Sequence, residues 1–501
     1  MTRRVLVGIC YALSIALLLA LAGCLSSKQL YEEAASAREA AYQRWKNRKQ
    51  QPEPLQTYIS GRLSLEDCLK LALVNNKTLQ RVFQEKEIAR GERLKSHSAI
   101  LPSVGLSADY LRKDEIASLG PITFDDLDNY SVGLTVNQPI FAGGSIMAKL
   151  KAGKLFYLLT NQTVRAAVQD TVYAAEHAYY DVLLNQHLFE IGKDAVRSAQ
   201  AHLDNVELKR QGGVASDFDL LRAQVELSNY QAWLIQNKNA INIAKANLLK
   251  VMGVSQDSNV TLSDELVYTP STITMEEAVE VAYQNRPDLF GREFDLQYQQ
   301  ELLKIFRSWY WPVISAFYSN TWSNPDPHSP IKIEWGRAWQ AGLTAVLPIF
   351  DGFAREGNII QQKARLKQAQ INLVDSEETA LFELTKALVS IENAKEFVES
   401  QHLNLSRARE GLRLAEVRYK EGIDTQVETI DAQLALTTAG ANYYDAIYSH
   451  VIAKLDLQKA MGALTTFEPA GPEDNARHRE SITAEKKRPA ALAKVEQEQI
   501  K

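Results

Sequence analysis

The chain contains one sequence pattern twice. A Pro-Ile-Phe tripeptide begins at Pro139 and again at Pro348, and matching glycines stand at Gly213 and Gly422. Both pairs are 209 residues apart (348 minus 139, and 422 minus 213). A repeat of this length with almost no drift indicates two structural units of the same kind that pack with quasi-symmetry. We expect the first unit at 61–269 and the second at 270–464.

Each unit is expected to be mainly helical, because residues 140–269 and 349–468 contain no proline. A helix over 143–211 would be about 100 Å long at ~1.5 Å per residue, which no globular core requires. The opening helix (65–100) and the returning helix (216–252) are each predicted to be about half that length. Two of them placed end to end would match one long helix, as a wall of uniform height needs.

Each long helix is predicted to end at a glycine turn, Gly213 in the first unit and Gly422 in the second. An S/T-x-x-D/E pattern typical of a helix start then follows, as Ser216 with Asp219 and as Thr425 with Glu428.

The returning helix carries two adjacent apolar seams. A helix with two seams contacts a neighbour on each side and can propagate into a ring, although an ordinary bundle helix with a broad apolar face gives a similar pattern. The first seam consists of Leu220, Ala223, Leu227, Tyr230, Leu234, Asn237, Ile241, Ala244, Leu248 and Val251. The second consists of Phe218, Leu221, Val225, Ala232, Ile235, Ala246 and Leu249, with polar breaks at Ser228, Asn239 and Asn242.

Between the opening helix and the long helix, the periodicity changes to two. Apolar residues alternate with small polar ones over 103–110 and 130–137, and again over 314–319 and 340–345. A half-buried sheet in a soluble protein gives this alternation, but the segment lengths also fit strands that cross a bilayer with lipid on one side and water on the other. Five of the seven tryptophans lie in or beside the second hairpin, as expected at lipid interfaces.

Prolines stand where helix is expected to meet strand. Pro102 and Pro312 are predicted to end a helix, and Pro139 and Pro348 to end a strand before a helix begins. Two hairpins give only four strands, and unpaired backbone groups in lipid cost several kcal/mol each. The chain is therefore expected to oligomerise in order to close a barrel.

The N-terminus reads as a secretory signal over 1–23, with Arg3 and Arg4 before an apolar run. Leu21-Ala22-Gly23-Cys24 resembles a bacterial lipobox, which implies cleavage before Cys24, a diacylglycerol on its sulfur and acylation of the new N-terminus. An uncleaved transmembrane anchor is the alternative. Residues 24–60 are expected to link the lipid anchor to the first unit, and the charged stretch 465–501 is expected to be a disordered tail.

Composition excludes several function classes. The formal charge of −5 is small and interspersed, so nucleic-acid binding has no electrostatic footprint. Once the signal is removed and Cys24 is acylated, Cys68 is the one cysteine left, and no intrachain disulfide can form. No spacing typical of a metal site, a catalytic serine or a phosphate loop occurs, so we expect no enzyme activity, no metal and no cofactor.

The residues at the glycine turns resemble a family motif. The TolC-like family of outer-membrane efflux proteins has Y-x-x-G followed by D-V-L-D-A, and Tyr419, Gly422, Asp431 and Ala432 match it, with Glu428 in place of the first Asp. The first unit matches more loosely. Arg210, Gly213, Asp219 and Ala223 hold the corresponding places. Together the resemblance covers about 60–464.

The resemblance implies a mainly α fold with a transmembrane β-barrel. Three chains would form one twelve-stranded barrel in the outer membrane, continuous with a long α-helical barrel in the periplasm. Such a homotrimer would be the passive exit duct of a tripartite efflux or export system. Its partners would be a periplasmic adaptor (a membrane fusion protein) and an inner-membrane transporter, either proton-driven or of the ABC type. The rivals are a non-conducting coiled-coil envelope lipoprotein and a periplasmic adaptor component.

The tip turns are the candidate gate and docking site. Glu428 and Asp431, with Asp219 of the first unit, would form acidic rings under threefold symmetry, and crowding would raise their carboxyl pKa values. The alternative for Asp219 and Glu428 is helix capping. The candidate adaptor-docking residues are Arg210, Gly213, Tyr419 and Gly422, whose alternative role is to end a helix.

Overall fold

The computed structural model describes residues 27–47, 58–115, 118–119, 122–123, 126–270, 273–329 and 333–464. The signal segment, Cys24 and the tail 465–501 lie outside the described residues. The chain divides into two compact bodies, an N-terminal body holding Met1–Ser60 with Asp257–Asn259 and a main body holding Gly61–Gln256 with Val260–Lys501. In the N-terminal body, α2 (Ser27–Asn47) has the ring of Tyr42 stacked on that of Trp45.

The same order of elements occurs twice along the chain. In the first half it is β1 (Ser60–Leu63), α3 (Leu65–Asn75), α4 (Lys77–Ser96), η1 (His97–Ala99), β2 (Ser103–Arg112), β3 (Ser118–Leu119), β4 (Ile122–Thr123), β5 (Asp128–Ala142), α5 (Ser145–Gln211), α6 (Asp217–Met252) and β6 (Asn259–Leu262). In the second half it is α7 (Met275–Asn285), α8 (Pro287–Arg307), η2 (Ser308–Tyr310), β7 (Val313–Asn324), β8 (Gly336–Val346), α9 (Ala354–Lys420) and α10 (Gln426–Ala460). The short strands pair as β1 with β6 and as β3 with β4.

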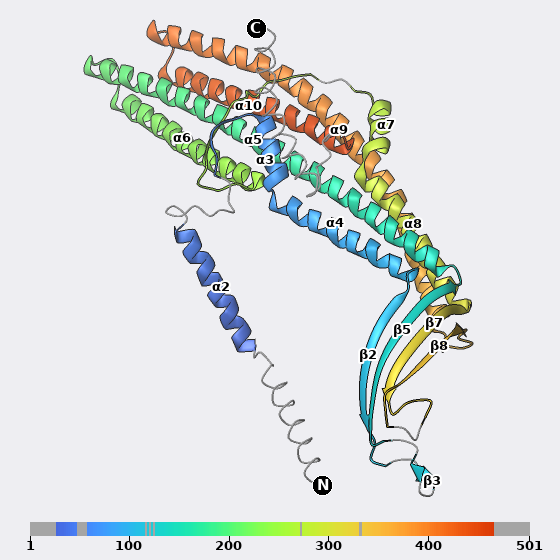
Figure 1. Cartoon of the computed structure of the whole chain (residues 1–501). Coiled ribbons are helices and arrows are strands. Elements are labelled where there is room, and N and C mark those ends of the chain that lie inside the picture. Colours follow the sequence, from blue (N-terminus) through green and yellow to red (C-terminus); the bar gives the residue numbers. More distant parts are fainter. Residues whose placement is uncertain are drawn as a thin grey trace, which may run out of the picture. The chain divides into compact units, whose positions relative to one another are not determined.

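Two helices of 67 residues each, α5 and α9, run the length of the helical part of the main body (Figure 1). At ~1.5 Å per residue each is about 100 Å long. The part of α5 near the sheet packs against α4 and α8, and the part far from the sheet packs against α6 and α10. Helix α9 likewise packs against α8 near the sheet and against α10 beyond it. Each long helix is therefore flanked by shorter helices over both parts of its length, and a closed helical wall stays a prediction.

Glycine in the left-handed conformation ends both long helices. Gly213 has φ +74° and Gly422 has φ +75°, values that a side chain disfavours. The amide of Val214 donates to the carbonyl of Lys209 at 2.8 Å, and the amide of Ile423 donates to that of Arg418 at 2.9 Å. These bonds satisfy the last helical carbonyls and turn the chain back.

The opening helix predicted over 65–100 is two helices instead. Asn76 has ψ 122° and separates α3 from α4, and its side chain accepts from the amide of Leu79 at 3.0 Å. The Asn76 amide group also donates to the carbonyl of Val251 at 2.8 Å, at the end of α6. The break therefore positions the returning helix. A single-helix prediction failed because the pattern of apolar residues continues across Asn76.

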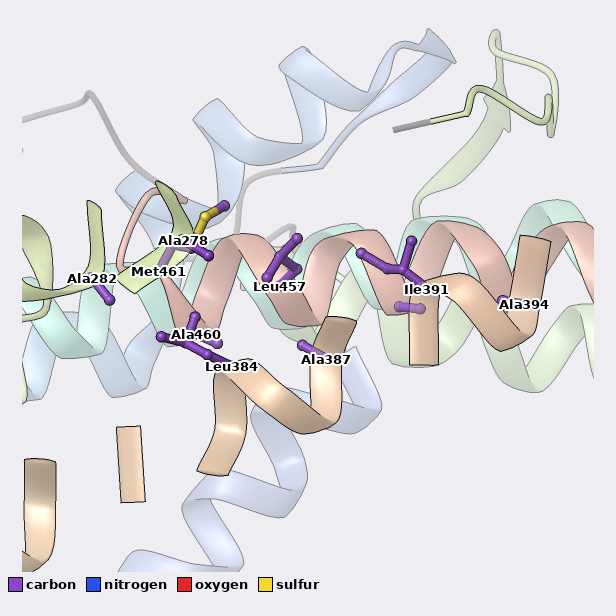
Figure 2. Close-up of a cluster of buried hydrophobic side chains, with 10 residues drawn as sticks. Ala278, Ala282, Leu384, Ala387, Ile391, Ala394, Leu457, Ala460 and Met461 are labelled. Carbon is purple, nitrogen blue, oxygen red and sulfur yellow. The ribbon is translucent and has the colours of Figure 1, made fainter. Parts of the chain in front are cut away.

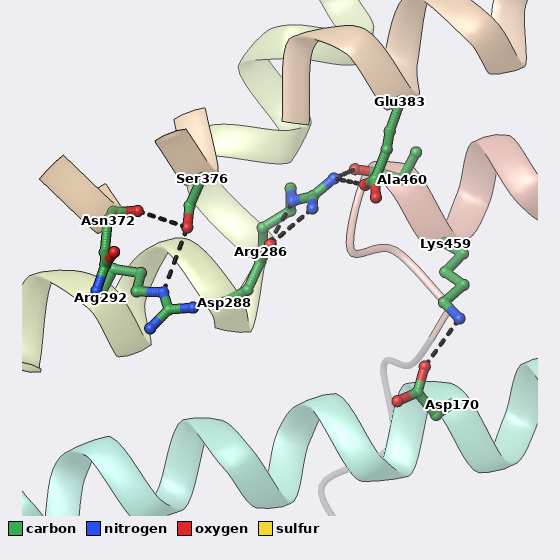
Figure 3. Close-up of polar contacts among 9 residues, drawn as sticks. All are labelled: Asp170, Arg286, Asp288, Arg292, Asn372, Ser376, Glu383, Lys459 and Ala460. Carbon is green, nitrogen blue, oxygen red and sulfur yellow. Dashed lines mark hydrogen bonds and ion pairs between the residues drawn. The ribbon is translucent and has the colours of Figure 1, made fainter. Parts of the chain in front are cut away.

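Arg286 holds the matching break in the second half. It precedes Pro287, and the residue before a proline avoids the helical conformation. Its guanidinium pairs with Asp288 and Glu383, each at 2.7 Å, and donates to the carbonyl of Ala460 at 2.9 Å (Figure 3). The side chain is 8% exposed. This one residue therefore ties α8 to α9 and to the end of α10, whose Lys459 in turn pairs with Asp170 of α5.

Each long helix forms a pair with its returning helix, α5 with α6 and α9 with α10, and small apolar residues fill the space between the helices of each pair. Because alanine lets two backbones approach closely, the long helices remain in contact over many turns without large side chains. One cluster joins α7, α9 and α10 (Figure 2) and consists of Ala278, Ala282, Leu384, Ala387, Ile391, Ala394, Ala453, Leu457, Ala460 and Met461. Another joins α5 and α6 and consists of Ala195, Ala199, Leu203, Val206, Ala223, Leu227 and Tyr230.

We expect Gly253→Ala to be strongly destabilising. Gly253 ends α6 at φ +69°, and a Cβ there would overlap the carbonyl of Asn75. The combined strain and overlap should lower the unfolding free energy by about 2–4 kcal/mol. Gly411→Ala is the matched control, because Gly411 lies inside α9 with open space around it and alanine there should stabilise by ~0.5–1 kcal/mol. Thermal melting followed by circular dichroism should shift in opposite directions for the two variants; equal shifts would contradict the packing described at Asn75.

Candidate functional site

Four strands form one antiparallel sheet at the end of the long helices, in the order β2-β5-β7-β8. The two predicted hairpins are confirmed, and β5 and β7 join them edge to edge. Across the sheet, Val104 pairs with Val136 and Leu106 with Leu134. Since side chains alternate between the faces of a strand, these pairs collect on one face.

The other face of the sheet is small and polar. Ser107 pairs with Gly133, which pairs with Thr321, and Gly105 pairs with Thr135. Phe317 is the exception, because its ring lies against Gly342, where a Cβ would come within 3.0 Å of the ring. One face therefore suits an apolar medium and the other suits water.

Aromatic and polar side chains meet on the apolar face toward the loop end of the second hairpin. Asn320, 5% exposed, accepts from Arg337 at 3.0 Å, and the Arg337 guanidinium lies 5.6 Å from the ring centre of Trp322. Trp339 pairs with Asn320 and packs on Tyr318. Such a mixed aromatic band is typical of a membrane interface.

The sheet has two open edges. In the part of the chain that the structure describes, β2 pairs with β5 alone and β8 pairs with β7 alone. All ten residues of β2 are exposed. Each edge therefore presents a row of unpaired backbone groups. Over those same described residues, no helix combines the length and the apolar character that crossing a bilayer would take.

The four prolines lie near the junctions of sheet and helix, with one correction. Pro102 and Pro312 directly precede β2 and β7, and Pro348 follows β8. Pro139 does not end its strand, because β5 continues to Ala142. The register with β7 shifts between Pro139 and Phe141, so a bulge accommodates the missing amide and the strand resumes beyond it.

At the first tip, the predicted capping box is confirmed. The Ser216 hydroxyl and backbone amide both donate to the Asp219 carboxylate, at 2.7 and 2.9 Å, and these bonds lower the pKa of Asp219. Arg210 pairs with Asp217 at 2.7 Å across the turn. Asp219 and Arg210 therefore have local partners within the turn.

The second tip is built in the same way. The Thr425 hydroxyl and amide donate to the Glu428 carboxylate and lower its pKa. Arg418 holds Asp424 through two bonds, at 2.6 and 2.7 Å. Asp431, one turn further along α10, is exposed and takes no part in the cap.

The structure brings the two tips together. The Lys209 ammonium of α5 lies 3.6 Å from the ring centre of Tyr419 of α9, and the Gln426 amide of α10 donates to the carbonyl of Asp219 at 3.1 Å. The candidate docking residues and the candidate gate residues therefore all lie in one end region of the main body. The docking residues are Arg210, Gly213, Tyr419 and Gly422, and the gate residues are Asp219, Glu428 and Asp431.

Helix α6 buries one predicted seam and exposes the other. Leu227 and Leu248 of the first seam are 9% and 0% exposed. In the second seam, Leu221 and Val225 are 60% and 61% exposed. Leu249 was assigned to the second seam but is 4% exposed, and α3 packs against α6, with Asn76 bonded to Val251 at its C-terminal end. The rest of the second seam has no partner among the described residues of this chain.

Sequence reasoning missed a polar seam between α5 and α10. The bonded pairs are Asp170–Lys459 (2.9 Å), Tyr173–Asp456 (2.7 Å), Asp181–Tyr448 and Ser198–Gln433 (2.6 Å), and the rings of His187 and Tyr444 stack at 4.1 Å. The two helices run antiparallel, so each step forward on α5 meets a step back on α10. These partners lie 235 to 289 positions apart in the chain and leave no local pattern, which is why sequence reasoning missed them.

Two further kinds of candidate site remain, a reactive cysteine and a cluster of metal ligands. Cys68 is fully buried, and burial raises the pKa of its thiol to about 12, so it stays protonated at physiological pH. Within the described ranges, no cluster of three or more His, Cys, Asp or Glu side chains could hold a metal ion.

Comparisons with known proteins agree with this geometry. The family model "Outer membrane efflux protein" matches residues 68–254 and 278–463. Outer membrane protein OprJ of Pseudomonas aeruginosa is 24% identical over 79% of this chain and 84% of its own length. The probable efflux pump outer membrane protein TtgC of Pseudomonas putida is 23% identical over 80% and 83%. The crystal structure of the Campylobacter jejuni CmeC outer membrane channel has a TM-score of 0.71 at 18% identity, over 83% of this chain and 88% of that one.

Removing a cap should loosen one tip locally. Ser216→Ala deletes the hydroxyl that bonds Asp219, which should cost about 1 kcal/mol at the start of α6. Hydrogen exchange at residues 217–220 should therefore accelerate about fivefold at pH 7. Ser228→Ala is the control, because its hydroxyl bonds the Gln224 carbonyl inside the same helix.

The pKa of Asp219 is lowered from 3.8, so the cap is complete above that pH and is lost only as the pH falls through the lowered value. Unchanged exchange would show that the box does not stabilise the tip.

Proposed function

Because the chain belongs to the outer membrane efflux protein family, we propose that it is the exit duct of a tripartite efflux or export system. One observation carries this proposal: a sheet with one apolar and one polar face, open at both edges, continues directly into helices about 100 Å long. A coiled-coil brace has no use for such a sheet. A family of outer-membrane channels also calls for no catalytic residue and no cofactor.

The duct is proposed to be a homotrimer. Three four-stranded sheets would give twelve strands, with β2 of one chain paired to β8 of the next, so that every backbone group in the lipid has a partner. The exposed seam of α6 supports the same closure at the helical level, because a second chain would cover its apolar residues. The apolar face of the sheet would contact lipid and the polar face would line the pore.

The orientation and domain division are proposed from the sequence. Residues 1–23 would be removed, Cys24 would carry the lipid, and 24–60 would lead to the two repeats at 61–269 and 270–464, followed by a tail at 465–501. Pro102, Pro139, Pro312 and Pro348 would mark the level where the barrel in the outer membrane meets the helices in the periplasm.

The tips are proposed to serve two purposes. The exposed turns at Arg210, Gly213, Tyr419 and Gly422 would dock the periplasmic adaptor, which couples the duct to a proton-driven or ABC transporter of the inner membrane. OprJ and TtgC are named as outer membrane or efflux pump components, which supports efflux as the process. Of the acids, Asp219 and Glu428 are occupied as caps, so Asp431 is the residue we assign to the gate.

Charge placed on the exposed seam of α6 should separate the protomers. Leu221→Glu with Val225→Glu puts two carboxylates on residues that are about three-fifths exposed in one chain and would be buried between two. A buried unpaired charge costs several kcal/mol, so the association constant should fall at least a hundredfold. Light scattering of the protein in detergent should report the mass of three chains for the parent and of one for the variant. Lys238→Glu, exposed but outside both seams, should leave the trimer intact; a parent that is monomeric in detergent would end the trimer proposal.

Removing the gate acid should change conduction. Asp431→Ala eliminates three carboxylates from a narrow pore, so the current through a planar bilayer should rise and block by divalent cations should weaken about tenfold. Glu428→Ala should add little beyond the loss of its cap. Glu207→Ala, which removes an equal charge from an exposed site on α5, is the control. Currents identical to those of the parent would remove Asp431 from the gate.

A further inference from the structure

A cavity of about 460 Å³ lies between the two helix pairs close to the tips. Both long helices and both returning helices contribute to its wall, with His202 from α5, Glu226 from α6, Tyr419 from α9, and Thr429 and Gln433 from α10. Any movement of the α9–α10 pair away from the α5–α6 pair would widen this cavity, which the exposed residues Glu416 and Lys420 already border. The cavity is distinct from the caps and from Asp431.

Several polar groups in this wall lack a partner. The Thr429 hydroxyl, on a residue 7% exposed, and Nε2 of His202 are buried without a hydrogen bond from the protein. Glu226 is half-buried, and no described residue forms a hydrogen bond or an ion pair with its carboxyl. Unpaired polar groups in such a place weaken the packing around them. The packing between the helix pairs is therefore marginal at this level, whereas nearer the sheet the Tyr173–Asp456 and Asp170–Lys459 bonds join α5 to α10.

The charges around Glu226 come from every helix packed there. On its own helix are Arg222 and Tyr230, and α10 contributes Asp431. The cavity wall adds His202, Lys209, Glu416, Tyr419 and Lys420. Burial raises the pKa of Glu226 to about 7, with Asp431 adding to the rise and Arg222 opposing it. Burial, aided by Lys209, lowers the pKa of His202, so His202 is neutral above pH 6.5.

We propose that Glu226 is a proton-operated latch between the two helix pairs, whose neutral carboxyl lets the α9–α10 pair close against the α5–α6 pair and whose carboxylate drives the two pairs apart. In the packed state the carboxylate would lie desolvated and close to Asp431. Once the pairs separate, water reaches Glu226 and the charge is accommodated. The latch itself is a property of one chain, and its effect on conduction rests on the proposed duct.

The sign of the pH dependence follows from linkage. The pKa of Glu226 is about 7 when packed and about 4.5 when exposed, so packing is stabilised at low pH and loses that stabilisation as the pH rises through 7. Between pH 8.5 and pH 6.5 the packed state should gain about fourfold in its equilibrium constant. Protonation of His202 opposes packing at lower pH, which sets pH 6.5 as the lower limit of the test.

Thiol accessibility measures the latch directly. Thr437→Cys places a probe on α10, at a position 7% exposed that faces Tyr230 of α6. Buried Cys68, with its raised pKa, provides little background. The maleimide labelling rate of the purified full chain, divided by that of Ile423→Cys at the exposed tip turn, should be about fourfold lower at pH 6.5 than at pH 8.5.

Two variants decide the assignment. In the Glu226→Gln background the Thr437→Cys ratio should be low and equal at both pH values, whereas Glu207→Gln should keep the fourfold change. A fourfold change that survives Glu226→Gln, or a parent with no change, would overturn the latch. Equal thermal midpoints for parent and Glu226→Gln exclude misfolding, and Glu226→Asp should restore a pH dependence. Because labelling needs no current, a protein that conducts nothing would count against the duct and not against the latch.

Discussion

The unpaired backbone groups along β2 and β8 constrain everything else in this protein. An amide or carbonyl without a partner is tolerable at a solvated edge and costs several kcal/mol in lipid, so the sheet cannot enter a bilayer as a single copy. The sheet alone leaves the number of copies open. The helices have to accept the same symmetry, because two residues separate β5 from α5 and seven separate β8 from α9. The exposed seam on α6 is the helical counterpart of the open strand edges, since both are surfaces that a second copy would complete.

Helix contacts within each pair differ from those between the pairs. Inside each pair, alanine and leucine interlock over many turns, as around Leu384 and Leu457, and such packing has no alternative arrangement of similar energy. Between the pairs, the α5–α10 contacts are hydrogen bonds, an ion pair and a ring stack. Polar contacts can be exchanged for water at little net cost. The contacts within each pair therefore differ in kind from these contacts between the pairs, and Arg286 holds α9 and α10 to the start of α8.

The tips show how local and long-range chemistry compete for the same residues. Asp219 and Glu428 stand at an acidic position of the family motif, where Glu428 replaces an Asp. Each is bonded within its own turn, to Ser216 or to Thr425. Their lowered pKa values make them poor sensors near neutral pH. Glu226 belongs to no motif, but helices from both halves surround it. A carboxyl that titrates near neutral pH needs surroundings that disfavour its charge, and packing creates those surroundings at Glu226.

The sequence by itself determined the lengths of the long helices, the glycine turns, the capping boxes and the two faces of each strand. Each of these depends on residues within about one helical turn or on a fixed periodicity, so local physics decides it. Only the tertiary structure decided the breaks at Asn76 and Arg286, the continuation of β5 past Pro139, the polar α5–α10 seam and the surroundings of Glu226. Pro287 was a signal for one of these breaks. The others depend on partners from 100 to 300 residues away, and no periodicity in a single chain encodes which side chains those helices will bring together.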